Sequence, residues 1–475
     1  MEFQAVKTTG IYCRADCGAK PLAKNVASIP SPVAALVAGY RPCLRCRPDR
    51  LPNLGLGVPT HELAKALVLV AEGYLDDHSN EELANRVGYS SRHLLRLFDQ
   101  HVGASPNFVA RARRSHLARR LLDESELSIT RVAFAAGFSS LRQMNREVRE
   151  LFSFSPSELR QKRRARDVLD PIDGGLRLRI PYSGTVAGQT LIDYLEPRAI
   201  PGVEVVENGR YFRTIETCGY PGVAEVSDPG GGDHLEVTLH LSTFSSIMEQ
   251  VEKARSLFGL NQDTSVAEKH LGRDPMLAPL IGAHPGVRLA GAWNRFETAI
   301  RIIVGQQVSV AGATTVTGRI ASRYGRKLDL ALPSGLSVLF PTPKRLAKAR
   351  PTKVGMPQAR FNTIVHFAKA VAAGDVDLAG PAGLEQSIKM LEAVPGIGPW
   401  TSNLIAARVM GEDDAFPAGD LGLRKAVDRL QGRRTPISAK ELEALSESWR
   451  PYRSIAAAYL WMSPMILSSM EKKKE

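Results

Sequence analysis

The sequence predicts a multidomain protein that is mainly helical, with smaller parts in which helices and strands combine. Its 475 residues are too many for one hydrophobic core, so about two to four domains are expected. Four of the five cysteines gather near the N-terminus, and a duplicated helical pattern follows them. Strand-like runs appear at 211–215 and 234–241, and helical patterns continue from about residue 245 to the end.

The formal net charge of +13 lies mainly in the first third of the chain. Residues 1–164 contain 25 Lys and Arg against 16 Asp and Glu, a net of +9, which leaves +4 for the other 311 residues. This balance favours a nucleic acid partner, because a Lys or Arg on a phosphate releases condensed counterions. A basic surface equally suits solubility or an acidic partner.

The chain has no basic-flanked apolar run at its start and no apolar stretch long enough to cross a bilayer. We therefore expect a cytoplasmic, nucleoid-associated protein with no membrane partner. In that reducing compartment cysteines are poor disulfide candidates and good metal ligands.

The first four cysteines form two close pairs, Cys13-x3-Cys17 and Cys43-x2-Cys46. This spacing suits one tetrahedral Zn²⁺ held by four thiolates, and on spacing alone a purely structural zinc ribbon is the simpler interpretation. The flanking segments TTGIYCR at 8–14 and GYRPCLRCRPD at 39–49 resemble the metal-binding domain of Ada-type methylation-damage sensors over about residues 3–50.

The resemblance to Ada-type sensors implies that Cys13 takes a methyl group irreversibly from a DNA phosphotriester. Zinc would keep this sulfur deprotonated yet nucleophilic, and Arg14 and Arg41 would steer the DNA backbone toward it. Methylation would remove one negative charge beside DNA, so the methylated protein should bind DNA more tightly.

Two later segments repeat each other, ELANRVGYSS at 82–91 and RVAFAAGFSS at 131–140. In each, a glycine (Gly88 or Gly137) ends one helix and a serine caps the next, which predicts two helix-turn-helix units rather than ordinary packed helices. The second helices are candidates for contacting bases in the major groove. The candidate residues are Arg92, His93, Arg96, Arg142, Gln143, Asn145 and Arg146.

The tails of the two repeats, ASP at 104–106 and FSPSEL at 154–159, extend their similarity. The whole of about 60–162 resembles the AraC-type DNA-binding domain, which Ada-type regulators carry after the zinc domain. The basic run KRRAR at 162–166 is interpreted as a solvated linker that touches phosphate.

A helix-hairpin-helix is predicted from LEAVPGIGPWT at 391–401. Gly396 and Gly398 leave a tight turn without side chains, so backbone N–H groups near Thr401 can approach a phosphate whatever the DNA sequence. A packing turn between two helices is the alternative.

Asp420 stands 22 residues after Gly398, in FPAGDLGLRK. Alone it would be an ordinary helix N-cap. Beside a hairpin that grips DNA, however, its carboxylate lies where glycosidic cleavage needs negative charge, because the departing base leaves an oxocarbenium-like sugar. N-alkylated purines already carry positive charge and need little general-acid help, so one carboxylate suffices.

Together with IVGQQVS at 303–309 and WRPYRS at 449–454, these motifs resemble AlkA-type 3-methyladenine DNA glycosylases over about 176–465. The resemblance implies that Asp420 is the catalytic carboxylate, that Gln307 fills the gap left by the flipped base, and that Trp400 and Trp461 line the base pocket. Indole faces attract a cationic base more than a neutral one. The resemblance also implies a monovalent cation held in the hairpin by the backbone carbonyls of Glu392, Val394 and Ile397.

Further positions bear on the chemistry. Trp400 stands where bifunctional relatives carry a Schiff-base Lys, so no strand-cleaving lyase is expected. Leu404 and the segment VAGQ at 186–189 replace aromatic residues of well-known members, which indicates a less aromatic pocket. Cys218, in ETCGY, lacks the Pro-Cys-His-Arg context of alkylguanine methyltransferases and is predicted to be a buried small apolar residue. No cysteines remain for an iron–sulfur cluster.

The sequence thus predicts a monofunctional DNA glycosylase that excises alkylated bases, fused to a methylation-responsive transcription regulator. The alternative is a DNA-binding activator of the alkylation response whose glycosylase domain is weak or inactive. Expected partners are double-stranded DNA, both alkylated and promoter, and RNA polymerase. The predicted parts are a four-cysteine zinc domain (1–52), an AraC-type double helix-turn-helix (60–162), a small α+β subdomain (172–250) and a helix-hairpin-helix glycosylase domain (251–470).

Overall fold

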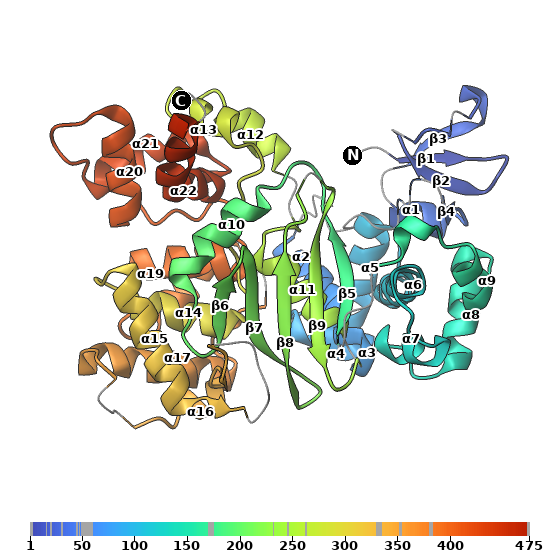
Figure 1. The fold of residues 1–475 in the computed structure, drawn as a ribbon, viewed down its shortest axis with the longest axis horizontal. Coiled ribbons are helices and arrows are strands. Elements are labelled where there is room, and N and C mark those ends of the chain that lie inside the picture. The colour runs from blue at the N-terminus through green and yellow to red at the C-terminus, as the bar shows by residue number, and fades with distance from the viewer. Residues whose placement is uncertain are drawn as a thin grey trace. The chain divides into compact units, whose positions relative to one another are not determined.

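The structure is a computed structural model, and it confirms a multidomain, mainly helical fold (Figure 1). It describes residues 3–15, 17–19, 21–29, 32–43, 46, 48, 60–169, 175–230, 232–244, 247–261, 264–328, 335–350, 354–379 and 383–472. The segments 49–59, between the predicted zinc and helix-turn-helix parts, and 170–174 lie outside the described residues.

The chain divides into two compact units. The first consists of Met1–Ser183, Thr217–Gly222 and Glu236–Glu252, and the second of Gly184–Glu216, Val223–Leu235 and Lys253–Glu475. Among the described residues, no helix is both long enough and apolar enough to cross a membrane.

The first unit begins with a four-stranded sheet in the order β3-β1-β2-β4. Strand β1 pairs antiparallel with β2 and β3, and β4 pairs parallel with β2. This register places Cys13 of β2 near the end of β4, where the Cys43 amide donates to the Tyr12 carbonyl at 3.0 Å. The elements are β1 (Phe3–Val6), β2 (Ile11–Arg14), β3 (Val26–Ile29), α1 (Pro32–Val37) and β4 (Arg41–Pro42).

The duplicated segments form two helix-turn-helix units, as predicted. Ser90 caps α5 by accepting from the His93 amide, and Ser140 caps α8 by accepting from the Gln143 amide. Gly88 and Gly137 have left-handed backbone angles (φ +78° and +86°), which glycine adopts without strain. The helices are α2 (His61–Glu72), α3 (Tyr74–Asp77), α4 (Asn80–Arg86), α5 (Ser91–Val102), α6 (Pro106–Glu124), α7 (Ile129–Ala135), α8 (Leu141–Phe152) and α9 (Pro156–Gln161).

Helix α6 joins the two helix-turn-helix units and packs against helices of both (Figure 1). Most of its residues are buried, including several arginines. Arg119, for example, is 2% exposed and pairs with Asp123 at 2.9 Å. Part of the basic charge counted in the first third of the chain is therefore neutralised inside this unit.

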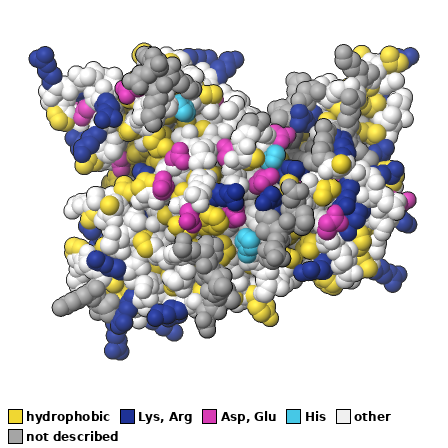
Figure 2. All heavy atoms as spheres, viewed as in Figure 1, with side chains coloured by type: hydrophobic (Ala, Val, Ile, Leu, Met, Phe, Trp, Pro, Cys, Tyr) yellow, Lys and Arg dark blue, Asp and Glu magenta, His cyan; other side chains and the backbone are white. Residues whose placement is uncertain are grey.

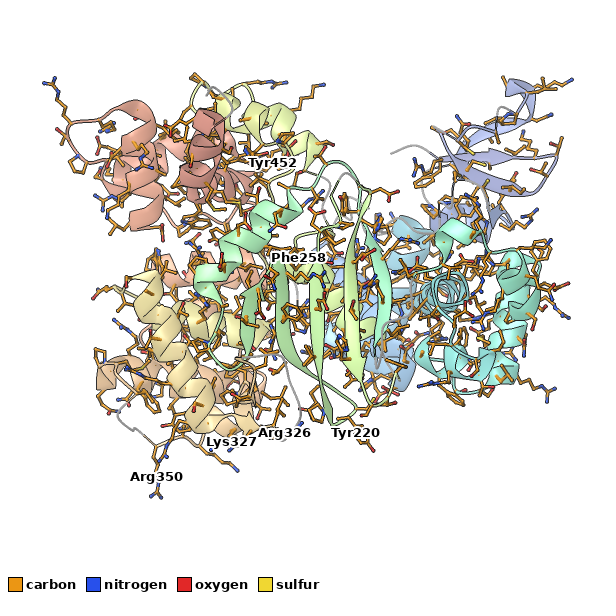
Figure 3. The ribbon with its side chains drawn as sticks, viewed as in Figure 1. Tyr220, Phe258, Arg326, Lys327, Arg350 and Tyr452 are labelled. Carbon is orange, nitrogen blue, oxygen red and sulfur yellow. The ribbon has the colours of Figure 1, made fainter. Side chains whose placement is uncertain are left out.

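A five-stranded sheet in the order β5-β9-β8-β7-β6 follows. The predicted run 211–215 lies in β7, and the run 234–241 is β9. Phe258, after α11, packs edge-on against Tyr211 of β7 (Figure 3). The elements are β5 (Leu176–Pro181), α10 (Gly188–Leu195), β6 (Glu204–Glu207), β7 (Arg210–Thr217), β8 (Tyr220–Ser227), β9 (His234–Leu241) and α11 (Ile247–Leu257).

The prediction that Cys218 is buried is wrong. Cys218 is exposed in the turn between β7 and β8, where its φ of +51° bends the chain back. Tyr220, which follows it, is 56% exposed (Figure 3). A two-residue hairpin turn needs left-handed angles, and this local demand outweighs the apolar character of the thiol.

The rest of the second unit is helical around a core that includes Phe296, Ile303, Phe367, Leu391 and Ile405. The elements are α12 (Ser265–Leu271), α13 (Ala278–Ala283), α14 (Arg295–Val304), α15 (Val310–Tyr324), β10 (Arg326–Lys327), β11 (Val338–Leu339), α16 (Pro343–Leu346), α17 (Gln358–Ala373), α18 (Leu384–Glu392), α19 (Pro399–Ile405), the π-helical turn Ala406–Met410, α20 (Leu421–Gln431), α21 (Ala439–Ser446) and α22 (Arg453–Lys472).

Candidate functional site

The predicted hairpin joins α18 to α19. Gly396 has a φ of +90°, and a Cβ there would lie 2.0 Å from Thr363 Oγ1 of α17, so only glycine fits. Gly398 is the N-cap of α19, and Pro399 occupies the first helical position, where its missing N–H costs nothing. The turn is therefore fixed by packing against α17.

Asp420 lies at the N-terminus of α20 and holds three hydrogen bonds. Its Oδ1 accepts from the Leu423 amide at 2.9 Å, which is the N-cap bond, and from Trp461 Nε1 at 3.0 Å. Its Oδ2 accepts from Trp400 Nε1 at 2.9 Å. Both oxygens of the half-buried carboxylate are thus oriented by indole N–H groups from α19 and α22.

Gly422 lies against this carboxylate. A Cβ at Gly422 would lie 2.9 Å from Asp420 Oδ1 and 3.4 Å from Trp461 Cδ1. The absence of a side chain at Gly422 therefore leaves room for Trp461 to contact Asp420 at the start of α20.

The segment between α14 and α15 reaches the hairpin through Gln306, a residue that sequence reasoning missed. Gln306 Nε2 donates to the Gly396 carbonyl at 3.0 Å and to Thr401 Oγ1 at 2.9 Å. Thr401 itself is 2% exposed. A pair of adjacent glutamines carries no sequence signal that separates the clamping residue from its neighbour.

The neighbour, Gln307, is exposed and has a φ of +54°, an uncommon value for a residue with a side chain. Val308 and Val310 beside it are each 42% exposed. The tip of this segment therefore presents one amide and two apolar side chains to solvent.

The WRPYRS motif at 449–454 makes buried contacts that hold the helix of Trp461 in place. Trp449 is fully buried, and its indole donates to Asp274 at 2.8 Å. Arg453, 3% exposed, donates from Nε to Asp414 at 3.0 Å. These contacts fix the start of α22, the helix that carries Trp461.

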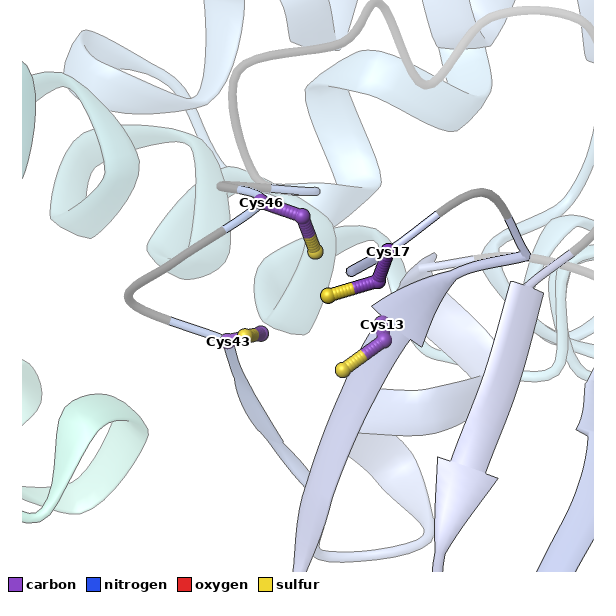
Figure 4. Close-up of side chains that lie close together, drawn as sticks. All are labelled: Cys13, Cys17, Cys43 and Cys46. Carbon is purple, nitrogen blue, oxygen red and sulfur yellow. The ribbon is translucent and has the colours of Figure 1, made fainter. Parts of the chain in front are cut away.

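The first unit brings Cys13, Cys17, Cys43 and Cys46 together, with all four sulfur atoms within 4.8 Å of one another (Figure 4). The Arg14 amide donates to Cys46 Sγ at 3.5 Å. Hydrogen bonding with Cys43 and Cys46, and then burial, raises the pKa of the Cys13 thiol well above its ordinary value. A cation is what lets such thiols ionise together, and four converging sulfurs fit a tetrahedral zinc ion.

The predicted base-contacting residues lie on α5 and α8. Arg92, Arg96, Arg142, Asn145 and Arg146 are exposed. Gln143 is half-buried and differs from them: its Oε1 accepts from the Ser139 amide at 3.0 Å, and its Nε2 donates to Glu147 at 3.0 Å. Figure 2 shows Lys and Arg side chains spread over the face in view, with Asp and Glu among them.

Four family models match the chain in succession. They are the metal binding domain of Ada at residues 2–49, a helix-turn-helix domain at 83–162, the AlkA N-terminal domain at 177–294 and the HhH-GPD superfamily of base excision DNA repair proteins at 300–451. One relative matches nearly the whole chain. The "Probable bifunctional transcriptional activator/DNA repair enzyme AlkA" of Mycobacterium tuberculosis (strain ATCC 25618 / H37Rv) is 36% identical over 460 residues, which cover 96% of this chain and 92% of the relative.

The chain belongs to this AlkA family of bifunctional activators and repair enzymes. Like that relative, it joins an AraC-type regulatory part to a 3-methyladenine DNA glycosylase domain. The "DNA-3-methyladenine glycosylase 2" of Escherichia coli (strain K12) is 33% identical over 57% of this chain and 92% of its own length. The 3-methyladenine DNA glycosylase structure from Archaeoglobus fulgidus has the same fold, with a TM-score of 0.51 and 24% identity over 60% of this chain and 97% of its own.

Proposed function

We propose that the second unit hydrolyses the N-glycosidic bond of alkylated bases in DNA, of the 3-methyladenine type, and that Asp420 is its catalytic carboxylate. The observation that supports this most is the pair of indole donors, Trp400 and Trp461, one on each oxygen of Asp420. A carboxylate held in this way is preorganised before the substrate arrives, which is what electrostatic stabilisation of a transition state requires.

In the proposed reaction, the C1′–N bond breaks and the leaving purine takes the bonding electron pair, which neutralises its positive charge. The Asp420 carboxylate stabilises the oxocarbenium-like sugar that remains. Water then adds to C1′, and its proton passes to the carboxylate or to solvent. No amine stands at the position of Trp400 to form a Schiff base, so the DNA strand should stay intact.

We further propose that Trp400 and Trp461 favour cationic bases because each indole face attracts positive charge. Leu404, one turn after Trp400 on α19, is 8% exposed and supplies an aliphatic wall. With fewer aromatic faces, the pocket should discriminate cationic from neutral lesions mainly through these two indoles.

Contact with DNA is proposed at two places in this unit. Gln307, exposed at the tip before α15, would enter the space left by the flipped base. The backbone amides of Gly396 and Gly398, and those that follow up to Thr401, would approach a phosphate. We also propose that the carbonyls of Glu392, Val394 and Ile397 hold a monovalent cation there. If so, replacing Na⁺ by a bulky quaternary ammonium ion should weaken binding to lesion DNA.

The test is Asp420→Asn, which keeps an N-cap acceptor and so preserves α20. On an alkylated duplex, base release should fall at least about 100-fold while binding is retained. Asp375→Asn, at an exposed site after α17, is the matched control and should leave release unchanged. Retained turnover in Asp420→Asn would remove Asp420 from the mechanism. A wild-type chain that binds lesion DNA but releases no base would favour the regulator with an inactive glycosylase domain.

For the first unit we propose one Zn²⁺ held by the four thiolates, with Cys13 as the acceptor of a methyl group from a DNA methylphosphotriester. The thiolate sulfur would attack the methyl carbon and leave a thioether and a phosphodiester. Mass spectrometry after incubation with methylphosphotriester DNA should show a gain of one methyl on the Cys13 peptide. Absence of that adduct in a zinc-loaded protein would leave a purely structural zinc site.

We propose promoter DNA as the ligand of the two helix-turn-helix units, through Arg92 and Arg96 of α5 and the exposed Arg142, Asn145 and Arg146 of α8. RNA polymerase is the proposed protein partner of the bound regulator. The four predicted parts, 1–52, 60–162, 172–250 and 251–470, are proposed as the functional divisions of the chain.

A further inference from the structure

A cluster of charged side chains connects the two helix-turn-helix units. None of its members is a candidate base-contacting residue, although Gln143 and Arg146 both contact its member Glu147. Its centre is Asp76 of α3, the helix that precedes α4 and α5 of the first helix-turn-helix. Arg114 of the joining helix α6 donates from Nη1 to Asp76 Oδ1 at 2.8 Å, and Arg113 pairs with Asp76 Oδ2. Arg113 Nη1 also donates to the Ala71 carbonyl of α2 at 3.2 Å.

Two turns close around the same carboxylate, one from each helix-turn-helix unit. Gly73 ends α2 with a φ of +97°, and Gly137 forms the turn before α8 with a φ of +86°. A Cβ at Gly73 would lie 2.9 Å from Asp76 Oδ2, and a Cβ at Gly137 would lie 3.1 Å from the same atom. The carboxylate therefore sits between the backbones of the two units.

The cluster continues to the second base-contacting helix. Glu147 of α8 is 3% exposed, and its carboxylate lies 3.9 Å from Arg114 Nη2 and 3.7 Å from Arg111 Nε. Arg114 thus lies between an acid of the first helix-turn-helix and an acid of the second. Its guanidinium is 10% exposed and reaches both carboxylates through separate nitrogens.

We propose that Asp76 is a positioning residue for DNA recognition: clamped by Arg113 and Arg114, it sets the spacing at which α5 and α8 meet their two half-sites. Proteins with two recognition helices bind half-sites at a spacing that mirrors their own geometry, so a rigid connection makes affinity depend sharply on that spacing. Asp76 acts on the connection and not on the bases. The proposal rests on DNA binding by both helices, and its test separates the two.

The experiment uses the full chain and a duplex selected from a random pool by the wild-type protein, with the two half-sites defined by footprinting. Spacer variants then move the half-sites apart by one, two and five base pairs, the last being about half a helical turn. For the wild type, five extra base pairs should lower affinity at least tenfold. Asp76→Asn removes the charge of the side chain and keeps its shape. In this variant the same insertion should lower the affinity for DNA less than threefold.

Asp77→Asn is the matched control, since Asp77 is the exposed neighbour on the same helix, and it should keep the wild-type spacing profile. A weaker fold alone would lower affinity at every spacing and leave the profile's shape unchanged. If Asp76→Asn does not fold, Arg114→Lys keeps the charge but loses the fork that reaches both acids, and it should broaden the profile as well.

A profile as sharp in the folded Asp76 or Arg114 variant as in the wild type would overturn the proposal. A wild-type footprint confined to one half-site would overturn two-helix binding itself, and would do so before any variant is measured.

Discussion

Replacing Trp461 by phenylalanine removes one of the two indole donors from Asp420 and keeps an aromatic ring at the position proposed to line the base pocket. The lost bond is Trp461 Nε1 to Asp420 Oδ1, at 3.0 Å, while the Leu423 amide still holds the same oxygen and Trp400 still holds the other. The perturbation therefore loosens the carboxylate without freeing it.

The size of the effect follows from the charge on the acceptor. A hydrogen bond to a charged group contributes about 1.5–3 kcal/mol, and each 1.4 kcal/mol changes a rate by about tenfold. If most of that energy orients the carboxylate toward the sugar, Trp461→Phe should lower the single-turnover rate of base release by about 10- to 100-fold. Lesion binding should change much less, because a phenyl ring still offers its face to a cationic base.

The assay is single-turnover release of methylated base, together with lesion binding measured separately. Trp400→Phe is the companion variant, and the double variant completes a thermodynamic cycle. Because both donors orient one carboxylate, their contributions are coupled, and the double variant should lose less than the product of the two single effects if the second loss adds little once the first has loosened Asp420. An unchanged rate in both single variants would refute the claim that the indoles position the carboxylate.

Three further outcomes are expected. Gly422→Ala places a Cβ 2.9 Å from Asp420 Oδ1, so the rate of base release should fall about tenfold. Because alanine raises the helix propensity by about 1 kcal/mol, the thermal stability should stay at or above the wild-type value. Gly396→Ala, at φ +90° and 2.0 Å from Thr363 Oγ1, should cost about 2–4 kcal/mol in denaturant unfolding, and a change below 1 kcal/mol would contradict the packing argument. If the four cysteines hold zinc as proposed, a chelator should unfold their segment, seen by proteolysis at its strands, and leave base release intact. Loss of base release would show that the second unit also depends on the metal.

Features set by local chemistry were predictable from the sequence. The serine caps of α5 and α8, strand β9 and the hairpin turn follow from residues within a few positions of one another. The clustering of the four cysteines was also predictable, since the spacing of the two pairs suits four ligands of one ion. In each case the residues that determine the structure lie close together in the sequence or recur in a regular pattern.

What the sequence did not reveal depends on contacts between distant segments. Gln306 bonds to Gly396, 90 residues away, and nothing near Gln306 indicates that partner. Asp76 of α3 meets Arg114 of α6 across 38 residues, and nothing near either residue in the sequence indicates the other as its partner. The exposure of Cys218 was missed for the opposite reason, because burial was inferred from residue type without regard to the hairpin turn.

The helix-cap role of Asp420 and the catalytic role proposed for it are compatible in one arrangement. Capping uses the Leu423 amide on Oδ1 and orients the carboxylate along the axis of α20, while the indoles fix its rotation. A cap interaction contributes about 1 kcal/mol to stability, so Asn at this position could maintain the helix as well as Asp does. Any dependence of base release on Asp at this position would then come from its charge, and charge is what a developing oxocarbenium ion requires. Stability and base release should therefore separate cleanly at this one residue, and at few others in the site.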